Sequence, residues 1–292
     1  MHAVGRPFKG ARKSTILRGL AAAAAVAFAV MAYVYLTLPD VRVLAGTNPT
    51  STAFMRLRQA EAERDGRKLR HRHQWVRYSR ISKNLQRAVL VAEDSRFFEH
   101  EGVDLEEIKK SIEINMDKLG AVRGASTITQ QLAKNLYLSP SKDPLRKLKE
   151  LIIARRLEAA LPKARIFEIY LNVIEWGDGV WGAEAAARQY FGIPASALSR
   201  EQAALLAGAI VNPRVLNPAR PNRRLLARQR IILGRMGGVE PPAPIPIPAP
   251  ADQQPTDELE PSADPAVPPT EEVPPPPEAI PYTPVPAPAE DA

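Results

Sequence analysis

The sequence predicts an all-α protein with one membrane-spanning helix near its N-terminus and a disordered, proline-rich tail at its C-terminus. Three observations support this fold class. Residues 19–38 are apolar and uncharged. Residues 85–235 carry apolar side chains at helical spacing, with few alternating strand patterns. The last 53 residues contain 19 of the 29 prolines. This segment can bury too little apolar surface to offset the entropy that an ordered chain would lose, so we expect it to be disordered.

The apolar run at residues 19–38 is about 20 residues long, enough to cross the roughly 30 Å hydrocarbon core of a bilayer as a helix. Residues 1–18 contain five basic side chains and no acidic one. Basic flanks stay on the cytoplasmic side of a membrane, so we expect everything after Pro39 to lie outside. A cleavable signal peptide is the competing interpretation of the alanine-rich start of this run.

The chain after the apolar run divides by composition into a basic juxtamembrane segment (39–84), a folded core (85–236) and a tail (237–292). All 40 Lys and Arg residues lie before Glu240, whereas eleven acidic residues lie from Glu240 onward. A strongly basic body favours anionic partners such as phosphate, nucleic acid or an acidic lipid surface. The juxtamembrane segment is either a solvated face or a surface held against anionic headgroups.

Cysteine is absent, which excludes disulfides, cysteine-ligated zinc and thiol catalysis. The first candidate for chemistry is a carboxylate. Glu93, Phe97 and His100 are spaced to share one face of a helix, with Phe97 anchored in the core and Glu93 at its rim. Apolar surroundings raise the pKa of a carboxyl group and make it a base near neutral pH. An isolated acidic pair here would instead be a solvated helix end.

A polar segment follows at residues 124–135, GASTITQQLAKN. Ser126 comes after a flexible glycine, where it would cap a helix whose N–H groups and positive dipole end face an anion. Two pairs of side chains then share a helix face at offsets of four: Gln130 with Lys134, and Gln131 with Asn135. So many uncharged polar groups are costly in a core helix and suit a groove that binds phosphate and sugar.

Basic side chains surround a second carboxylate in residues 142–150, KDPLRKLKE. Lys142, Arg146 and Glu150 lie at successive offsets of four, with Lys149 beside them. Alone, this pattern is an ordinary salt-bridged surface helix whose pairs contribute about a few tenths of a kcal/mol each. Together with the preceding polar segment, it predicts a cationic wall for a pyrophosphate.

These segments resemble the monofunctional biosynthetic peptidoglycan transglycosylases, a family of membrane-anchored peptidoglycan glycosyltransferases. Five motifs carry the resemblance: E-D-x-x-F-x-x-H-x-G at Glu93–Gly102, G-x-S-T-x-T-Q-Q at Gly124–Gln131, R-K-x-x-E at Arg146–Glu150, K-x-x-I-L-E-x-Y-L-N at Lys163–Asn172, and R-x-x-x-V-L at Arg228–Leu233. Phe167 replaces a leucine and Ile232 a valine, and both are apolar exchanges. The resemblance covers residues 46–235 and neither the first 18 residues nor the tail.

The resemblance implies a lysozyme-like fold with a membrane-embedded jaw. It also implies polymerisation of lipid II, a disaccharide-pentapeptide on undecaprenyl pyrophosphate, into β-1,4 glycan strands. Glu93 would be the catalytic base, and Glu150 would orient cations, a metal ion or the reacting sugar. The resemblance and the spacing together give the expected substrate-binding residues: Ser126, Thr129, Gln130, Gln131, Lys134, Asn135, Lys142, Arg146 and Lys149.

No organic cofactor is implied, and a divalent cation, Mg²⁺ or Mn²⁺, is left open without assigned metal ligands. Expected partners are lipid II, the nascent glycan strand, the cytoplasmic membrane and other cell-wall synthesis or division proteins. We expect a single-pass protein of the cytoplasmic (inner) membrane, with a cytoplasmic N-terminus and its catalytic domain on the periplasmic or extracellular side. The expected position of the catalytic domain outside the cytoplasm and the lack of interleaved aromatic residues disfavour nucleic acid as a partner.

Two other functions compete with polymerisation. A lytic glycosidase that cuts peptidoglycan would also be helical and use a glutamate, but it would not need the lysine and arginine groups. A non-enzymatic envelope scaffold would act through the proline-rich tail. For the scaffold, replacing Glu93 by glutamine would be harmless and deleting residues 240–292 would abolish activity.

Overall fold

The computed structural model of the chain describes residues 10–68, 71–104, 106, 126–140, 143–238 and 241, all within the first of two compact units, Met1–Gln253. The described residues are mostly helical, as predicted, whereas nearly all of the predicted tail lies outside them. The elements are α1 (Gly10–Leu36), η1 (Arg42–Ala45), α2 (Ala53–Arg64), β1 (Arg72–His73), η2 (Tyr78–Arg80), α3 (Lys83–Glu93), α5 (Ile128–Tyr137), α6 (Pro144–Ala160), α7 (Lys163–Val173), β2 (Glu175–Gly177), β3 (Val180–Trp181), α8 (Ala183–Phe191), η3 (Ala195–Ala197), α9 (Arg200–Ala209), α10 (Arg223–Arg235) and η4 (Met236–Gly238).

α1 contains the predicted membrane span. Its part Thr15–Leu36 has a mean hydropathy of 2.0 and is long and apolar enough to cross a membrane. Large apolar side chains on it, including Phe28 and Leu36, are exposed. Such a helix suits a hydrocarbon surrounding, because its backbone groups are satisfied internally and its side chains prefer a nonpolar medium.

A small three-stranded sheet interrupts the helices. β3 lies between the other two strands, parallel to β1 with Arg72 opposite Val180, and antiparallel to β2. Asp178 and Gly179 connect β2 to β3, and Gly179 has the positive φ of 71° that such a tight turn favours. Each strand is two or three residues long, so its sequence is too short to show a strand's alternating pattern.

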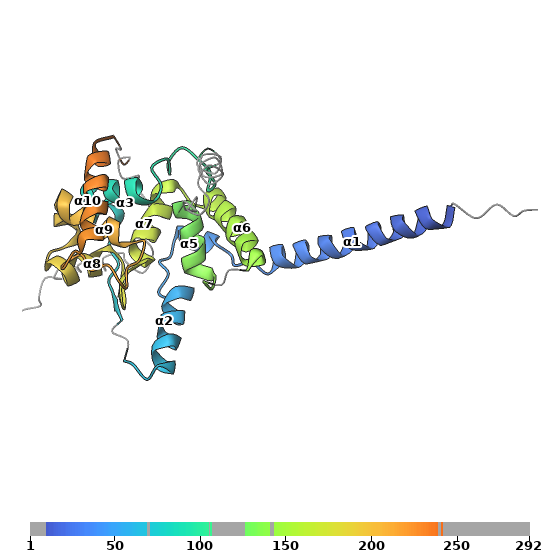
Figure 1. Cartoon of the computed structure of the whole chain (residues 1–292), viewed down its shortest axis with the longest axis horizontal. Coiled ribbons are helices and arrows are strands. Elements are labelled where there is room, and N and C mark those ends of the chain that lie inside the picture. The colour runs from blue at the N-terminus through green and yellow to red at the C-terminus, as the bar shows by residue number, and fades with distance from the viewer. Residues whose placement is uncertain are drawn as a thin grey trace, which may run out of the picture. The chain divides into compact units, whose positions relative to one another are not determined.

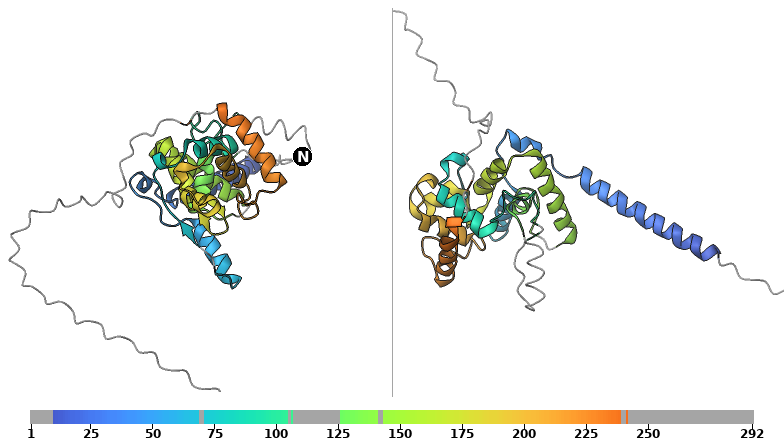
Figure 2. Two further views of the ribbon diagram at one scale, coloured as in Figure 1. Left: turned by 90° about the vertical axis from the view of Figure 1, so that its left-hand side faces the viewer. Right: turned by 90° about the horizontal axis from the view of Figure 1, so that it is seen from above.

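The helices around the site form two groups. α3, α9 and α10 pack together, and α5 packs against both α6 and α7 (Figure 1). Figure 2 shows the helical body from two further sides, with α10 in orange on its outside. The C-terminal end of α3 meets the N-terminal end of α5, so residues from the two motif segments come together there.

α7 is buried along nearly its whole length, from Ala164 to Val173. A helix buried on every side cannot satisfy its polar side chains with water. Arg165, Glu168 and Asn172 are nevertheless among its buried residues, with Arg165 only 1% exposed. Their partners must therefore come from the protein.

Polar side chains of α7 fasten the chain that precedes α3. Arg165 donates to the backbone carbonyl oxygens of Leu44 (2.9 Å) and Thr47 (2.8 Å). Asn172 accepts from the backbone N–H of Val76 and donates to its carbonyl oxygen, both at 2.9 Å. These bonds hold the juxtamembrane segment against the core. The folded region therefore begins well before residue 85, where the sequence predicted it to start.

We expect Arg165→Met to lower the free energy of unfolding by about 3–5 kcal/mol, because the buried Glu168 carboxylate loses its cationic partner and keeps the hydrogen bond from the N–H of Tyr78. Denaturant unfolding of the detergent-solubilised protein measures this. The matched control is Arg224→Met on the exposed face of α10, which should change stability by less than about 0.5 kcal/mol. Equal effects of the two substitutions would contradict the proposed fastening role.

Candidate active site

α3 ends at Glu93, so the predicted helix face shared by Glu93, Phe97 and His100 does not form. The backbone turns at Asp94, which is extended with φ −165°. Phe97 is fully buried, as predicted, and packs against Phe167 of α7 with ring centroids 5.6 Å apart. His100 bonds through Nε2 to both carboxylate oxygens of Asp94 at 3.1 Å. Glu93 is therefore the last helical residue before a fixed turn.

Two of the first three backbone N–H groups of α5, those of Ile128 and Gln130, are already used, which corrects the expectation of a free anion site there. The carboxylate of Asp94 accepts from the N–H of Ile128 (3.0 Å), the first residue of the helix. Thr127, not the predicted Ser126, caps the helix by accepting from the N–H of Gln130 (3.2 Å). The positive end of α5 thus holds the turn that follows Glu93.

Two predicted substrate-binding residues, Thr129 and Gln130, are buried in the contacts around this turn. Gln130 and Thr127 both donate to the carbonyl oxygen of Gly102, at 3.1 and 2.7 Å. Thr129 is fully buried, and its hydroxyl donates to Glu158 of α6 at 2.5 Å. We conclude that these two side chains hold α5 in place and do not line the pocket beside Glu93.

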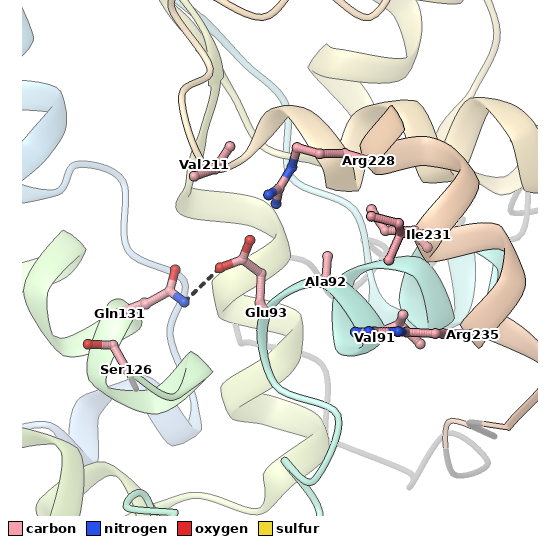
Figure 3. Close-up of a pocket in the computed structure, with 10 residues that line it drawn as sticks. Val91, Ala92, Glu93, Ser126, Gln131, Val211, Arg228, Ile231 and Arg235 are labelled. Carbon is pink, nitrogen blue, oxygen red and sulfur yellow. Dashed lines mark hydrogen bonds between the residues drawn. The ribbon is translucent and has the colours of Figure 1, made fainter. Parts of the chain in front are cut away.

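A pocket of about 380 Å³ opens beside Glu93 (Figure 3). The amide of Gln131 donates to the Glu93 carboxylate at 2.9 Å, and the hydroxyl of Tyr170 on α7 donates to the Gln131 oxygen at 3.0 Å. This chain of hydrogen bonds fixes which oxygen of Glu93 remains free for a ligand. The pocket wall includes Ser126, Val91, Val211, Ile231, Arg228 and Arg235.

Burial raises the pKa of Glu93 above its ordinary value. The hydrogen bond from Gln131 and the charges of Arg228 and Lys134 oppose this rise, whereas Asp94 adds to it. A raised pKa gives a carboxylate with increased proton affinity, the property required of a general base. The direction of this shift is the one that the sequence predicted for Glu93.

A cluster of cations surrounds Glu150, which is 3% exposed. Arg146 and Lys147 each donate to one of its carboxylate oxygens, both at 2.5 Å. Lys147 also donates to the side-chain oxygen of Gln130 at 3.0 Å and so joins the two predicted segments. Lys147, rather than the predicted Lys149, is the lysine in these contacts.

Lys134 lies within electrostatic reach of both carboxylates. Burial lowers its pKa, and the charges of Arg146 and Lys147 lower it further, whereas Glu150 and Glu93 raise it. Three cations thus share one buried counter-charge, Glu150, on this side of the site. Such an excess of positive charge favours a ligand with more than one negative charge.

The Transglycosylase family model matches residues 65–237 of the chain. A biosynthetic peptidoglycan transglycosylase of Laribacter hongkongensis is 51% identical over 195 residues, which are 67% of this chain and 86% of the relative. Proteins of the same description from Nitrosospira multiformis and Methylobacillus flagellatus are 50% and 51% identical, with 85% of each relative covered. The chain belongs to the biosynthetic peptidoglycan transglycosylase family.

The remaining predicted site residues of the transglycosylase fall in three places. Ser126 lines the pocket, where Lys147 also approaches its hydroxyl at 3.5 Å. Asn135 is buried and donates to the backbone carbonyl oxygen of Gln131 at 2.8 Å, which supports that residue from the next turn of α5. Lys142 lies outside the described residues.

Sequence analysis assigned no site role to three residues that the transglycosylase brings into contact with its pocket or cation cluster. Lys147 lies three residues before Glu150, a spacing that predicts a helical ion pair and could have identified it. Tyr170 and Arg228 lie within two of the family motifs, yet no local pattern relates them to Glu93. Their proximity to it is a product of helix packing alone.

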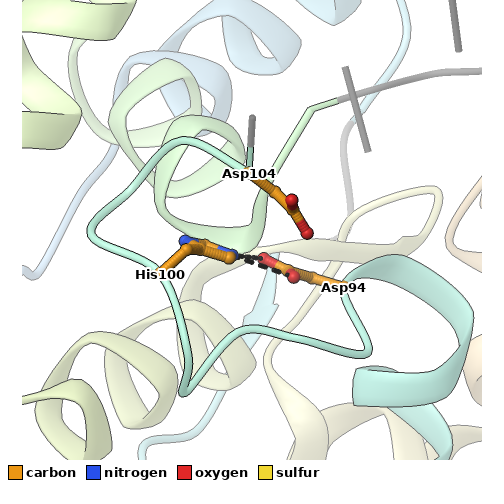
Figure 4. A group of neighbouring side chains, drawn as sticks. All are labelled: Asp94, His100 and Asp104. Atoms are coloured by element: carbon orange, nitrogen blue, oxygen red, sulfur yellow. Dashed lines mark hydrogen bonds and ion pairs between the residues drawn. The ribbon is translucent and has the colours of Figure 1, made fainter. Parts of the chain in front are cut away.

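Asp94, His100 and Asp104 gather closely enough to suggest a metal site, with ligand atoms all within 4.8 Å of one another (Figure 4). Both carboxylates already have partners, because Asp94 accepts from His100 Nε2 and from the N–H of Ile128, and Asp104 pairs with Arg96 at 3.4 Å. We interpret the cluster as a hydrogen-bonding network that holds the turn. A divalent cation in this transglycosylase stays a prediction.

We expect Lys147→Met to lower the rate of glycan formation by about 100-fold, because it removes a charge and a contact to both Gln130 and Glu150. Lys149→Met, on the same helix, should retain the rate within about threefold. Initial rates on labelled substrate measure both. A larger loss for Lys149→Met than for Lys147→Met would restore the original assignment of Lys149.

We expect Glu93→Gln to stabilise the folded transglycosylase at pH 8. The folded-state pKa of Glu93 is raised, so ionising it costs folding free energy above that pKa and nothing below the unfolded-state pKa. The gain in melting temperature should therefore shrink as pH falls. Glu101→Gln, at an exposed glutamate, is the control and should show no such pH-dependent gain. A gain independent of pH would contradict a raised pKa.

Proposed function

We propose that the chain polymerises lipid II into β-1,4 glycan strands and releases undecaprenyl pyrophosphate, with Glu93 as its catalytic base. The observation that carries this proposal is the arrangement of charge. One carboxylate of raised pKa faces a pocket, and Lys134, Arg146 and Lys147 lie along the neighbouring helices. That arrangement suits a reaction in which a hydroxyl loses its proton and a polyanion departs.

In the proposed step, the 4-hydroxyl oxygen of the acceptor GlcNAc attacks the anomeric carbon at the pyrophosphate-bearing end of the donor strand. The hydroxyl proton passes to Glu93 as the new C–O bond forms. The bond from the anomeric carbon to the pyrophosphate oxygen breaks on the opposite face, and its electron pair leaves with the pyrophosphate. The configuration at the anomeric carbon is therefore inverted.

The cations serve the departing group in this scheme. Inverting glycoside hydrolases need a carboxylic acid to protonate a poor leaving group. Pyrophosphate already leaves readily, so fixed positive charge is sufficient to stabilise the transition state. Lys134, Arg146 and Lys147 would supply it, with Lys142 as a further predicted member.

Glu150 supports these cations and is not arranged as an acid or a nucleophile. Both of its oxygens are bonded, to Arg146 and Lys147, and the side chain is almost fully buried. A buried carboxylate in this position keeps two cationic side chains in fixed places when no substrate is bound. We propose this orienting role as the function of the second carboxylate.

The apolar helix α1 fits a substrate carried in a membrane. Anchoring confines enzyme and lipid substrate to one surface and raises their effective concentration. The basic flank before α1 favours a cytoplasmic N-terminus and therefore a catalytic domain on the outer side. We propose this single-pass topology, with the membrane and the nascent strand as the principal partners.

We expect Glu93→Gln to fold normally and to lose nearly all polymerisation, by about 100-fold or more, because an amide cannot accept the proton. Polymer formation from labelled lipid II in detergent measures this directly. Glu101→Gln is the matched control and should polymerise as the unsubstituted protein does.

Each other outcome selects a different function. Equal polymer from the unsubstituted protein and Glu93→Gln would keep the reaction and exclude this base. Soluble muropeptides released from purified cell wall would favour a lytic glycosidase. No polymer under varied detergent and metal, together with loss of function on deleting residues 240–292, would favour the scaffold.

A further inference from the structure

Arg228 reaches the active-site pocket from α10, a helix that packs on α3 and also brings Arg235 to the pocket wall, whereas the other cations of the site lie on α5 and α6. The Nε–H of Arg228 donates to the backbone carbonyl oxygen of Gly208 on α9 at 2.9 Å. A Cβ added at Gly208 would lie 3.0 Å from Leu225 and 3.5 Å from the Cβ of Arg228, so the two helices are in close contact there. This contact fixes the base of the Arg228 side chain.

The guanidinium group of Arg228 points into the pocket toward the carboxylate of Glu93 (Figure 3). The positive charges of Arg228 and Lys134 both lower the pKa of Glu93. Lys134 belongs to α5 and to the cluster with Arg146 and Lys147, whereas Arg228 belongs to the opposite wall. Glu93 therefore lies between cations on two separate helices.

Glu93 must be ionised before it can accept a proton, and burial opposes ionisation. The charged and hydrogen-bonding groups around it are Asp94 after α3, Gln131 and Lys134 on α5, Tyr170 on α7, and Arg228 and Arg235 on α10. The charge of Asp94 raises the pKa of Glu93 and so opposes its ionisation. The hydroxyl of Tyr170 donates its hydrogen bond to Gln131 and not to Glu93. Among these described groups, the hydrogen bond from Gln131 and the charges of Lys134 and Arg228 lower the pKa of Glu93, and Arg235 adds a further positive charge to the pocket wall.

Lys134 is poorly suited to this task. Burial and two neighbouring cations disfavour its charged form, and an arriving pyrophosphate would draw that charge toward the leaving group. An arginine stays protonated at all accessible pH values and keeps its charge in a partly buried site. Arg228 belongs to α10, whereas Lys134, Arg146 and Lys147 belong to α5 and α6, so we assign its charge to Glu93 and theirs to the leaving group.

We propose that Arg228 is a positioning residue that holds the Glu93 carboxylate ionised in its pocket until the acceptor hydroxyl arrives. Its charge acts on the base and not on the leaving group. This proposal rests on the proposed function, because it assigns a role within the same reaction.

The first test is the pH dependence of kcat/KM for lipid II polymerisation. Arg228→Gln retains a donor for the Gly208 carbonyl oxygen and removes the charge, so it should move the acidic limb of the profile to higher pH. We expect a loss of about tenfold at pH 6 and of less than about twofold at pH 9. Arg228→Lys should restore most of the activity at pH 6, and Arg230→Gln, exposed on the same helix, should follow the unsubstituted profile.

The second test needs no activity and separates this proposal from the proposed function. Melting temperatures are measured at pH 6 and pH 8 for the unsubstituted protein, Glu93→Gln, Arg228→Gln and the double variant. Without Arg228, ionised Glu93 should be costlier, so the stabilisation by Glu93→Gln at pH 8 should increase. An unchanged gain would overturn the proposal whether or not the protein polymerises lipid II.

A purely structural role gives a different result in both tests. It predicts that Arg228→Gln lowers kcat/KM by the same factor at every pH and that Arg228→Lys lowers it equally. Either of these outcomes would also overturn the proposal. If Arg228→Gln does not fold, Arg228→Lys provides the test. The proposal then requires that Arg228→Lys be more active at pH 6 than Glu93→Gln and that the acidic limb of its pH profile stay where it is in the unsubstituted protein.

Discussion

α7 is a helix buried on every side, and the need to satisfy its polar side chains without water organises the rest of the structure. Arg165 and Asn172 bind the backbone of the chain that follows the apolar helix α1. Tyr170 reaches the other way and orients Gln131 against Glu93. One helix thus links the segment after α1 to Glu93, the proposed base, and releasing any of these bonds would leave a buried polar group unpaired.

The site balances desolvation against charge. A base needs a dry surrounding for its proton affinity to rise, but the same surrounding favours the neutral acid. Cations on both sides of Glu93 offset part of that effect. In the cation cluster, Glu150 performs the reverse task, because its negative charge keeps the side chains of Arg146 and Lys147 together.

Several local predictions were wrong because a side chain from elsewhere in the fold competed with the local pattern. Asp94 binds the N-terminus of α5 and thereby ends α3 at Glu93, although the spacing to His100 favoured a longer helix. The polar face predicted for a ligand is partly consumed by the protein, since Thr129 bonds to Glu158 and is fully buried. Spacing gives the helix face of a residue but not which neighbour covers that face.

The sequence by itself determined the helical class, the apolar span, the basic body and the two segments that contain Glu93 and Gln131, because composition and periodicity are properties of the chain alone. The short strands, the exact end of α3 and the choice of Lys147 over Lys149 were decided by tertiary structure. So was the position of Arg228 opposite Glu93. The physical reason is that burial and electrostatic fields depend on distances between helices, and those distances are fixed only when α7, α9 and α10 pack.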